Sequence, residues 1–244
     1  MDISTDENIL FKTDTITKKN LCELNSFLDE WDQRYKLQAQ SIPLFIETEN
    51  RGWNIKQKKF FARAFYHVRG HFHDFLWYLG NHAPDKRSKE VILHNLMEEF
   101  GGQAQSHEKL YIHFAKSLDV QDINDEILEQ TTYLPFIKEF NKGHLSRLYT
   151  HSWHDNLAIF SAYERLDNID YTNLMTLVKN WGIPDKDSVF FKVHMLVEHF
   201  ETTLSTLLSI WTINKQTVID AFNFIASHQL QMWKNLSAAV VEYS

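Results

Sequence analysis

The stretch TKKNLCELNSFLDEWDQRY, residues 17–35, decides the fold class of this chain. Its apolar side chains recur at steps of three and four residues, at Leu21, Leu24, Phe27, Leu28, Trp31 and Tyr35. This spacing places them on one face of an α-helix, and Thr17 can cap the start of that helix. The sequence therefore predicts an amphipathic helix from Thr17, preceded by a loosely ordered arm over residues 1–15.

The same periodicity continues along most of the chain. It predicts further helices over residues 54–81, 86–100, 108–118, 125–141 with a kink near Pro135, 144–166, 170–180, 185–211 and 216–242, and a short element near 42–52. Asn54 and Asn214 are candidate N-caps. The 244 residues include only 7 glycines and 4 prolines, too few for the many tight turns of an all-β fold. The prediction is one all-α helical bundle over residues 16–244.

Composition narrows the functions that the chain can have. The formal net charge is −7 and no basic run or stripe is present, which argues against nucleic-acid binding. No segment approaches the roughly 20 apolar residues that a membrane span requires. Cys22 is the only cysteine, so no internal disulfide can form, and the start MDISTDEN is unlike a secretory signal peptide. We therefore expect a cytoplasmic protein.

A carboxylate and a histidine occur around the end of the predicted helix over residues 86–100. With a turn of about 100° per residue, its apolar face is defined by Val91, Ile92, Leu93, Leu96, Met97 and Phe100. Glu98 falls nearly opposite this face and Glu99 on its border, so Glu99 is the better inward candidate. His107 follows the break at Gly101 and Gly102, where the chain can turn back toward Glu99.

Two other predicted helices carry candidate ligands beside apolar positions. Glu164 follows Phe160 by one helical turn. His194, Glu198 and Glu201 are spaced i, i+4 and i+7, which places all three on one stripe of a helix. A carboxylate on such a face needs a partner, because an isolated buried charge is very unfavourable.

These candidates can be grouped around one site, which consists of Glu99, His107, Glu164, His194, Glu198 and Glu201. Helical bundles build di-metal sites from inward Glu and His on facing helices. Carboxylates can bridge two metals, and imidazole suits iron. Four carboxylates would balance the charge of two divalent ions. The alternative is that the residues are solvated or locally paired, as Glu99 would be beside a Lys or Arg.

Three stretches resemble the haem-oxygenase-like di-iron oxidase and oxygenase family, which shares its fold with TenA-type thiaminases and pyrroloquinoline-quinone synthase. The stretches are Asn95–Gly101 followed by His107, Ala162–Glu164, and Phe190–His194. The resemblance spans roughly residues 43–211 and implies a haem-oxygenase-like (TenA-like) bundle. It also implies a non-haem di-iron enzyme, with manganese as the alternative metal, that uses O₂ to oxidise a small organic substrate. A homodimer is compatible with this fold.

The last of these motifs departs from the family pattern. The family usually has a His, an Asp four residues later and a second His seven residues later. Here Glu198 stands at the Asp position and Glu201 at the position of the second His. Either Glu201 ligates metal in place of that histidine, or the second metal is weak or missing. A change of register would recruit His199 instead.

Two other functions are consistent with the sequence. A metal-free oxidase of the pyrroloquinoline-quinone synthase type would use a histidine-lined pocket, with candidates at His67, His71, His73, His151 and His154. A non-catalytic binding protein that retains the fold would suit the altered ligand set. A TenA-type thiaminase is disfavoured, because Cys22 lies in the first predicted helix and outside the matching stretch.

Overall fold

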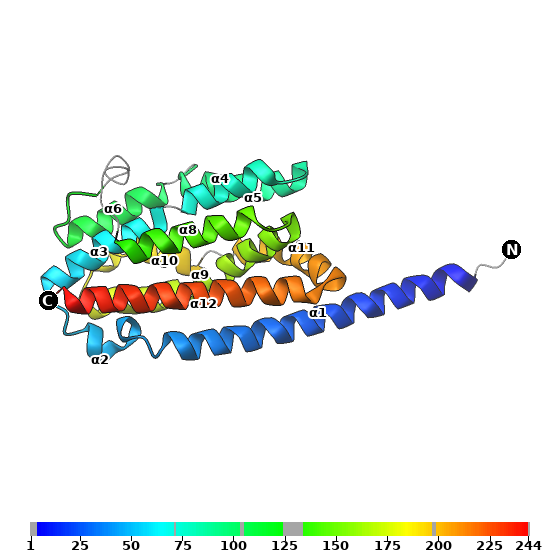
Figure 1. The fold of residues 1–244 in the computed structure, drawn as a ribbon, viewed down its shortest axis with the longest axis horizontal. Coiled ribbons are helices and arrows are strands. Elements are labelled where there is room, and N and C mark those ends of the chain that lie inside the picture. Colours follow the sequence, from blue (N-terminus) through cyan, green and yellow to red (C-terminus); the bar gives the residue numbers. More distant parts are fainter. Residues whose placement is uncertain (1–3, 71, 103–104, 124–133, 197–198, 244) are drawn as a thin grey trace.

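Every regular element of the described residues is a helix. The structure, a computed structural model, describes residues 4–70, 72–102, 105–123, 134–196 and 199–243, without the side chains of residues 4–16 and 199. These ranges contain no β-strand, which confirms the predicted all-α class. The long helices lie roughly side by side in a bundle (Figure 1).

The N-terminal half begins with one very long helix and continues with shorter ones. In chain order these elements are α1 (Ser4–Ala39), the 3-10 helix η1 (Pro43–Phe45), α2 (Glu47–Asn50), α3 (Ile55–Gly70), α4 (Phe72–His82), α5 (Lys86–Glu99) and α6 (His107–Ser117). Asp85 and Ser106 cap α5 and α6, because each side chain accepts a hydrogen bond from a backbone N–H of the first turn.

The C-terminal half contains two helices of 28 residues, α9 and α12. In chain order its elements are α8 (Pro135–Tyr149), α9 (Trp153–Asn180), η2 (Asp185–Asp187), α10 (Val189–Leu196), α11 (His199–Ile213) and α12 (Lys215–Glu242). Ser152 and Asp155 form a reciprocal capping box at the start of α9. Asn214 caps α12, as predicted from the sequence.

Several predicted helix boundaries were wrong. Helix α1 begins at Ser4 rather than Thr17, and residues 54–81 form the separate helices α3 and α4. The predicted division between residues 166 and 170 does not occur, because α9 contains no Gly or Pro that would end it there. The chain divides instead at residues 150–152, where the capping box starts α9. Residues 124–133 lie outside the described ranges, and α8 begins at Pro135, since proline fits the first turn of a helix.

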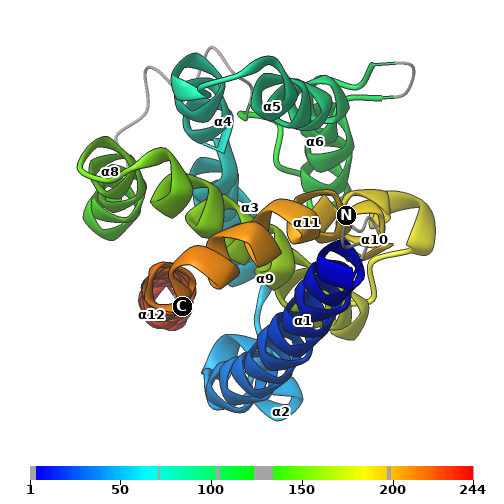
Figure 2. The same ribbon diagram turned by 90° about the vertical axis from the view of Figure 1, so that its right-hand side faces the viewer.

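Helix α9 lies at the centre of the bundle. Helices α10, α11 and α12 pack against it, and α1, α2 and η1 also contact it (Figure 2). Every residue from Asn156 to Ala162 is buried. A helix that is buried all round needs no single apolar stripe. This central position brings acidic side chains of α9 into the interior.

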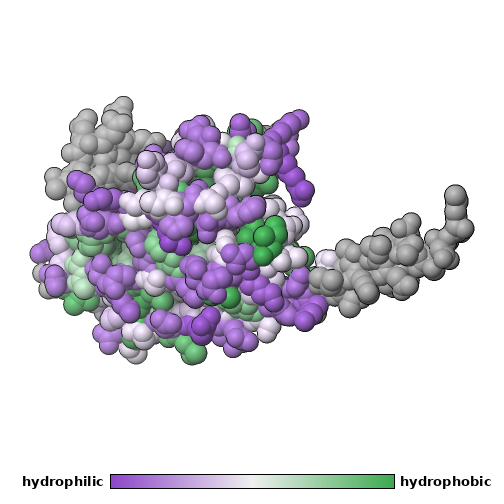
Figure 3. All heavy atoms as spheres, turned by 45° about the vertical axis from the view of Figure 1, so that its right-hand side comes forward, coloured by the Kyte–Doolittle hydropathy of each residue, from purple (hydrophilic) through white to green (hydrophobic). Residues whose placement is uncertain are grey.

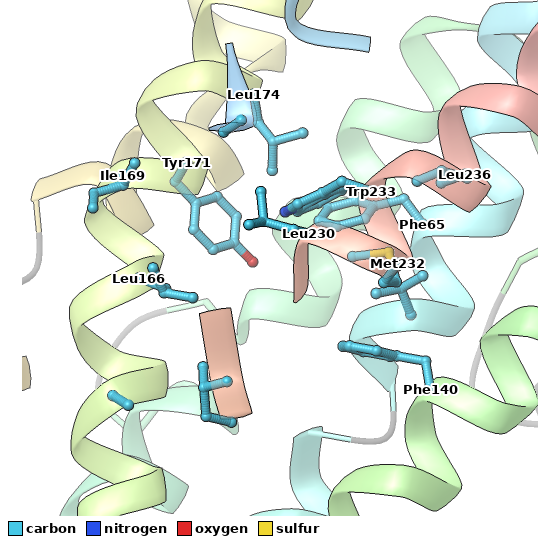
Figure 4. Close-up of a cluster of buried hydrophobic side chains, with 14 of the residues drawn as sticks. Phe65, Phe140, Leu166, Ile169, Tyr171, Leu174, Leu230, Met232, Trp233 and Leu236 are labelled. Carbon is cyan, nitrogen blue, oxygen red and sulfur yellow. The ribbon is translucent and has the colours of Figure 1, made fainter. Parts of the chain in front are cut away.

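Aromatic side chains fill the space between α9, α12 and α3. The ring centroids of Trp233 in α12 and Phe65 in α3 are 5.6 Å apart. Figure 4 shows Trp233 and Leu230 of α12 near Tyr171 and Leu174, which extend from α9. Such pairs account for part of the chain's 18 Phe and 7 Trp, because each aromatic ring buries a large apolar area.

The apolar face predicted for α5 was only partly right, because Ile92 and Leu96 are buried but three other members are not. Leu93, Met97 and Phe100 are more than half exposed. The buried positions of this helix are Ile92, Asn95, Leu96 and Glu99. These positions follow steps of three and four residues, but two of them are polar, so hydrophobicity alone identified only part of the buried face. Figure 3 shows a mostly hydrophilic surface on which apolar side chains are scattered.

None of the described helices is both long and apolar enough to cross a membrane.

One buried carboxylate joins three helices. Asp170 of α9 is 2% exposed. It accepts hydrogen bonds from the Tyr35 hydroxyl of α1 at 2.8 Å and from Trp233 Nε1 of α12 at 2.9 Å. Burial raises the pKa of Asp170 to about 7, although hydrogen bonds from Trp233, Tyr35 and Gln229 act in the opposite direction. The contact fixes α1 and α12 to α9, and its protonation state changes near neutral pH.

We expect the free energy of unfolding to fall as pH rises through the titration range of Asp170. The pKa rises from an ordinary 3.8 to about 7, so the folded state holds the proton more tightly. The resulting stability is fully present below pH 3.8 and is lost as pH passes through 7. A shift of this size corresponds to about 4 kcal/mol.

Urea denaturation in mildly acidic and mildly alkaline buffer measures this effect. Asp170→Asn should remove the Asp170 part of the pH dependence, because asparagine does not titrate. Asp220→Asn, at an exposed position of α12, is the matched control and should keep the wild-type dependence. An Asp170→Asn protein with the wild-type pH dependence would contradict the assignment.

Candidate metal centre

Three helices bring one carboxylate and two imidazoles together. Glu99 ends α5, His107 begins α6 and His194 lies in the last turn of α10. Their exposures are 7%, 6% and 8%. One ligand atom from each side chain lies within 4.8 Å of the other two. Within the described part of the chain, this is a group that can hold a metal ion.

A glycine turn after α5 contributes to the meeting of Glu99 and His107. Gly101 and Gly102 have φ angles of 91° and 29°, in the left-handed region that favours glycine. Their backbone N–H groups donate to the carbonyl oxygens of Glu98 and Met97, which ends α5. His107 Nδ1 then lies 2.9 Å from Glu99 Oε1. The expectation that this break turns His107 back toward Glu99 is confirmed.

Hydrogen-bond donors and positive charge surround the Glu99 carboxylate. Its Oε1 faces His107, and its Oε2 accepts a hydrogen bond from Arg69 Nη2 at 2.9 Å. His73 Nε2 lies 3.5 Å from Oε2. Burial alone would raise the pKa of Glu99, but His107, His73 and Arg69 outweigh it and hold the pKa well below its usual range. Glu99 is therefore ionised.

His194 presents a lone pair in the interior. Its Nδ1 lies 2.8 Å from the carbonyl oxygen of Phe190, which makes Nδ1 the donor and leaves Nε2 unprotonated. Nε2 is buried, has no hydrogen-bond partner among the described residues, and lies 3.9 Å from Glu99 Oε1. Burial, together with the neighbouring His107, lowers the pKa of His194 to about 3. The imidazole is neutral, as a metal ligand must be.

These atoms fit a shared metal ion. A buried nitrogen without a partner is unfavourable, and a metal ion would satisfy it. Ligand atoms that are about 2.0–2.2 Å from one ion lie about 3–4 Å from each other. The separations from Glu99 Oε1, 2.9 Å to His107 Nδ1 and 3.9 Å to His194 Nε2, are close to this spacing. Two His and one carboxylate are also the donor set of many non-haem iron sites.

Aromatic side chains and an arginine hold the histidine in place. The rings of Tyr171 and His194 stack with centroids 4.3 Å apart and an interplanar angle of 19°. The Arg69 guanidinium lies 4.9 Å from the centroid of Phe190. Burial would lower the pKa of Arg69, but Glu99 and a hydrogen bond with Tyr171 outweigh it and raise the pKa. Arg69 is thus a permanent buried cation beside the three candidate ligands.

Two further carboxyl groups of α9 influence this centre. Glu164 is 3% exposed. Burial raises its pKa well above the usual range, and the charges of Asp167, Glu99 and Glu98 act in the same direction. Burial also raises the pKa of Asp167, with contributions from Asp170 and Glu99. In both groups the protonated form is therefore favoured relative to an ordinary carboxyl group.

The remaining predicted ligands are not placed at this centre. Glu198 lies outside the described residues, and so does the side chain of His199. Glu201 is exposed and lines a separate groove together with Arg165. The prediction assumed that the buried stripe of α10 continues in α11. In α11, however, Phe200 and Thr203 are the buried positions around Glu201.

The other sequence predictions have mixed outcomes. Glu99 is the inward residue, as predicted, and Glu98 is partly exposed and lies 3.5 Å from His94. Among the histidines proposed for a metal-free pocket, His73 lies beside Glu99, His154 is exposed, and His71 lies outside the described residues.

Sequence reasoning missed Arg69, Asp167 and Tyr171. Arg69 lies four residues after Phe65 on α3, and both are buried. That spacing was a usable signal for an inward side chain, but arginine is rarely buried without a partner. Asp167 follows Glu164 by three residues, and the same helical spacing that linked the other candidates would have found it.

One comparison with known proteins identifies a family for this chain. A family model for iron-containing redox enzymes matches residues 59–203. The chain belongs to this family. The matched segment includes Glu99, His107, Glu164 and His194. No curated protein matches the chain in sequence.

Two solved structures have the same fold as this chain. A CADD-like protein of unknown function from Nostoc punctiforme PCC 73102 has a TM-score of 0.67 and 16% identity, over 88% of this chain and 96% of that chain. A domain of unknown function with a heme oxygenase-like fold from Shewanella denitrificans OS217 has a TM-score of 0.68 and 14% identity, over 90% of this chain and 92% of that chain. The haem-oxygenase-like fold expected from the sequence is confirmed.

Tyr171→Ala should weaken metal binding, because the stacked ring fixes the orientation of His194. Loss of a residue that supports a ligand typically lowers metal affinity about 10- to 100-fold. Tyr171→Phe keeps the ring and is the matched control, with an affinity closer to that of the wild type. Anaerobic titration with ferrous iron measures both. Equal affinities for Tyr171→Ala and the wild type would show that the stack does not position His194.

Proposed function

We propose that this protein is an iron-dependent oxidoreductase that uses O₂ to oxidise a small organic substrate. One observation carries the proposal. His194 Nε2 is buried, lacks a partner among the described residues, and faces Glu99 beside His107. The protein fixes the opposite nitrogen of the same ring through Phe190. This is how metal-binding histidines are commonly oriented.

Glu99, His107 and His194 would hold the iron. Bound iron would supply the redox chemistry and the O₂-binding position that amino-acid side chains lack. Manganese suits the same donors. Arg69 holds Glu99 through Oε2, and the backbone of Phe190 holds His194 through Nδ1. The ligands are therefore fixed before an ion arrives.

The chain's own residues also control water and protons at this centre. Glu99, His107 and His194 are each less than a tenth exposed, so bulk water has little access to them. Burial raises the pKa of Glu164 and of Asp167 and so favours their protonated forms. Positive charge brought to the centre would favour release of these protons. The two carboxyl groups would then balance part of the charge of a bound ion.

The sequence also led us to expect two iron ions, which is a more specific proposal than iron-dependent chemistry. Its second ion would need Glu164 together with Glu198 or Glu201. Glu201 lines a different groove, and Glu198 lies outside the described residues. The described donor group accommodates one ion, and we propose a single iron at Glu99, His107 and His194. The cytoplasmic location and the homodimer stay predictions.

A metal-free protein, either an oxidase or a binding protein, is the second candidate. The Arg69–Glu99 ion pair favours it, because the guanidinium neutralises the carboxylate without a metal. This pair leaves His194 Nε2 unsatisfied among the described residues, however. Iron content separates the two functions.

His194→Ala should lose most of the bound iron while the helical content stays near that of the wild type. Removing the imidazole deletes one bond to the metal, whereas the surrounding core remains packed. The measurement is iron retained after anaerobic reconstitution and desalting, combined with far-ultraviolet circular dichroism and ferrous-dependent O₂ uptake.

His94→Ala is the matched control for this experiment. His94 lies on α5 with 61% of its side chain exposed, and its replacement should leave the iron content unchanged. A folded wild-type protein that retains no iron would rule out the proposed function and favour the metal-free alternative.

A further inference from the structure

Arg69 occupies an unusual position for an arginine. It lies near the end of α3, is 6% exposed, and donates to Glu99 Oε2 at 2.9 Å. A guanidinium stays protonated under all ordinary conditions. It therefore brings one fixed positive charge into the interior, next to His107 and His194.

This contact limits what the Glu99 carboxylate can do. A carboxylate that bridges two metal ions uses one oxygen for each ion. In Glu99, Oε1 faces His107 and Oε2 is bonded to Arg69. One oxygen is therefore available to the ion that His107 and His194 would share. The other is directed to the guanidinium.

The charges of the described residues also favour one metal ion over two. Arg69 and Glu99 form a buried ion pair, so the guanidinium already neutralises the carboxylate. A second divalent ion would add its charge next to this fixed cation in a buried region, which is unfavourable where the dielectric constant is low.

We propose that the Arg69 guanidinium takes the place of a second metal ion, so that the centre holds one divalent ion and one fixed cation. This inference rests on the proposed function, because it concerns the same ligands. Arg69 is a positioning residue that acts through Glu99. It blocks the bridging oxygen and supplies the charge that a second ion would bring.

Iron stoichiometry in three proteins tests this role. The wild type, Arg69→Lys and Arg69→Gln are reconstituted anaerobically with excess ferrous iron, desalted and analysed for iron per folded chain. The wild type and Arg69→Lys should each hold one ion, because both keep a positive charge at this position. Arg69→Gln removes the charge and frees Glu99 Oε2. This oxygen and the buried carboxyl group of Glu164 would then be available to a second ion, so Arg69→Gln should hold two ions.

Spectroscopy gives a readout that a purely structural role of Arg69 would not change. The wild type and Arg69→Lys should show an isolated high-spin ferrous ion by Mössbauer and electron paramagnetic resonance spectroscopy. Arg69→Gln should show two ions that are magnetically coupled. Circular dichroism confirms that each protein is folded.

Each outcome decides the proposal. Two ions in the wild type, or one ion in folded Arg69→Gln, would overturn the role of Arg69. If Arg69→Gln does not fold, the wild type and Arg69→Lys decide: one isolated ion in each supports the proposal, and a coupled pair in either overturns it. A wild type without any iron would instead contradict the proposed function, so the two failures are distinguishable.

Discussion

A carboxylate can be buried in a helical bundle only where donors or positive charge meet it. In this haem-oxygenase-like bundle, Glu99 is such a carboxylate. Its partners come from separate helices, Arg69 from α3, His73 from α4 and His107 from α6. The helices must therefore converge at the end of α5. The glycine turn after α5 and the capped start of α6 satisfy this condition locally. The position of the centre thus follows from the neutralisation of one charge.

Two buried acids of helix α9 have different surroundings. Asp170 accepts hydrogen bonds from Tyr35 and Trp233, so its carboxylate has a structural role between three helices. Burial favours the protonated form of Glu164, six residues earlier, and the charges of Asp167, Glu99 and Glu98 act in the same direction. A buried acid with satisfied hydrogen bonds stabilises one arrangement of helices. A buried acid close to the candidate ligands instead changes its protonation when charge enters the centre. Asp170 therefore belongs to the contacts between helices, and Glu164 to the surroundings of the candidate metal centre.

The sequence predicted those features that depend on local periodicity. The all-α class, the cap at Asn214 and the inward position of Glu99 all follow from positions within one helix. The errors in side-chain placement have a common physical cause, since they depend on what another helix presents. Met97 belongs to an apolar row of α5 that stays more than half exposed. The position of Glu201 depends on where α11 packs, which the spacing from His194 could not reveal. Arg69 is buried because Glu99 lies opposite it, a pairing that only the folded chain brings together.

Two features of this chain, the glutamate at position 201 in α11 and the buried Arg69, both affect the charge at the candidate metal centre. In the family pattern that the sequence resembles, a second histidine would stand at position 201, where this chain has an exposed glutamate. Without a histidine at position 201, a second ion would bind weakly. With Arg69 buried beside Glu99, a second ion would also meet a fixed positive charge. Both features support the proposal that the centre holds one ion. A metal ion can dissociate, whereas a guanidinium on α3 cannot, so in this proposal one of the two cations is permanent.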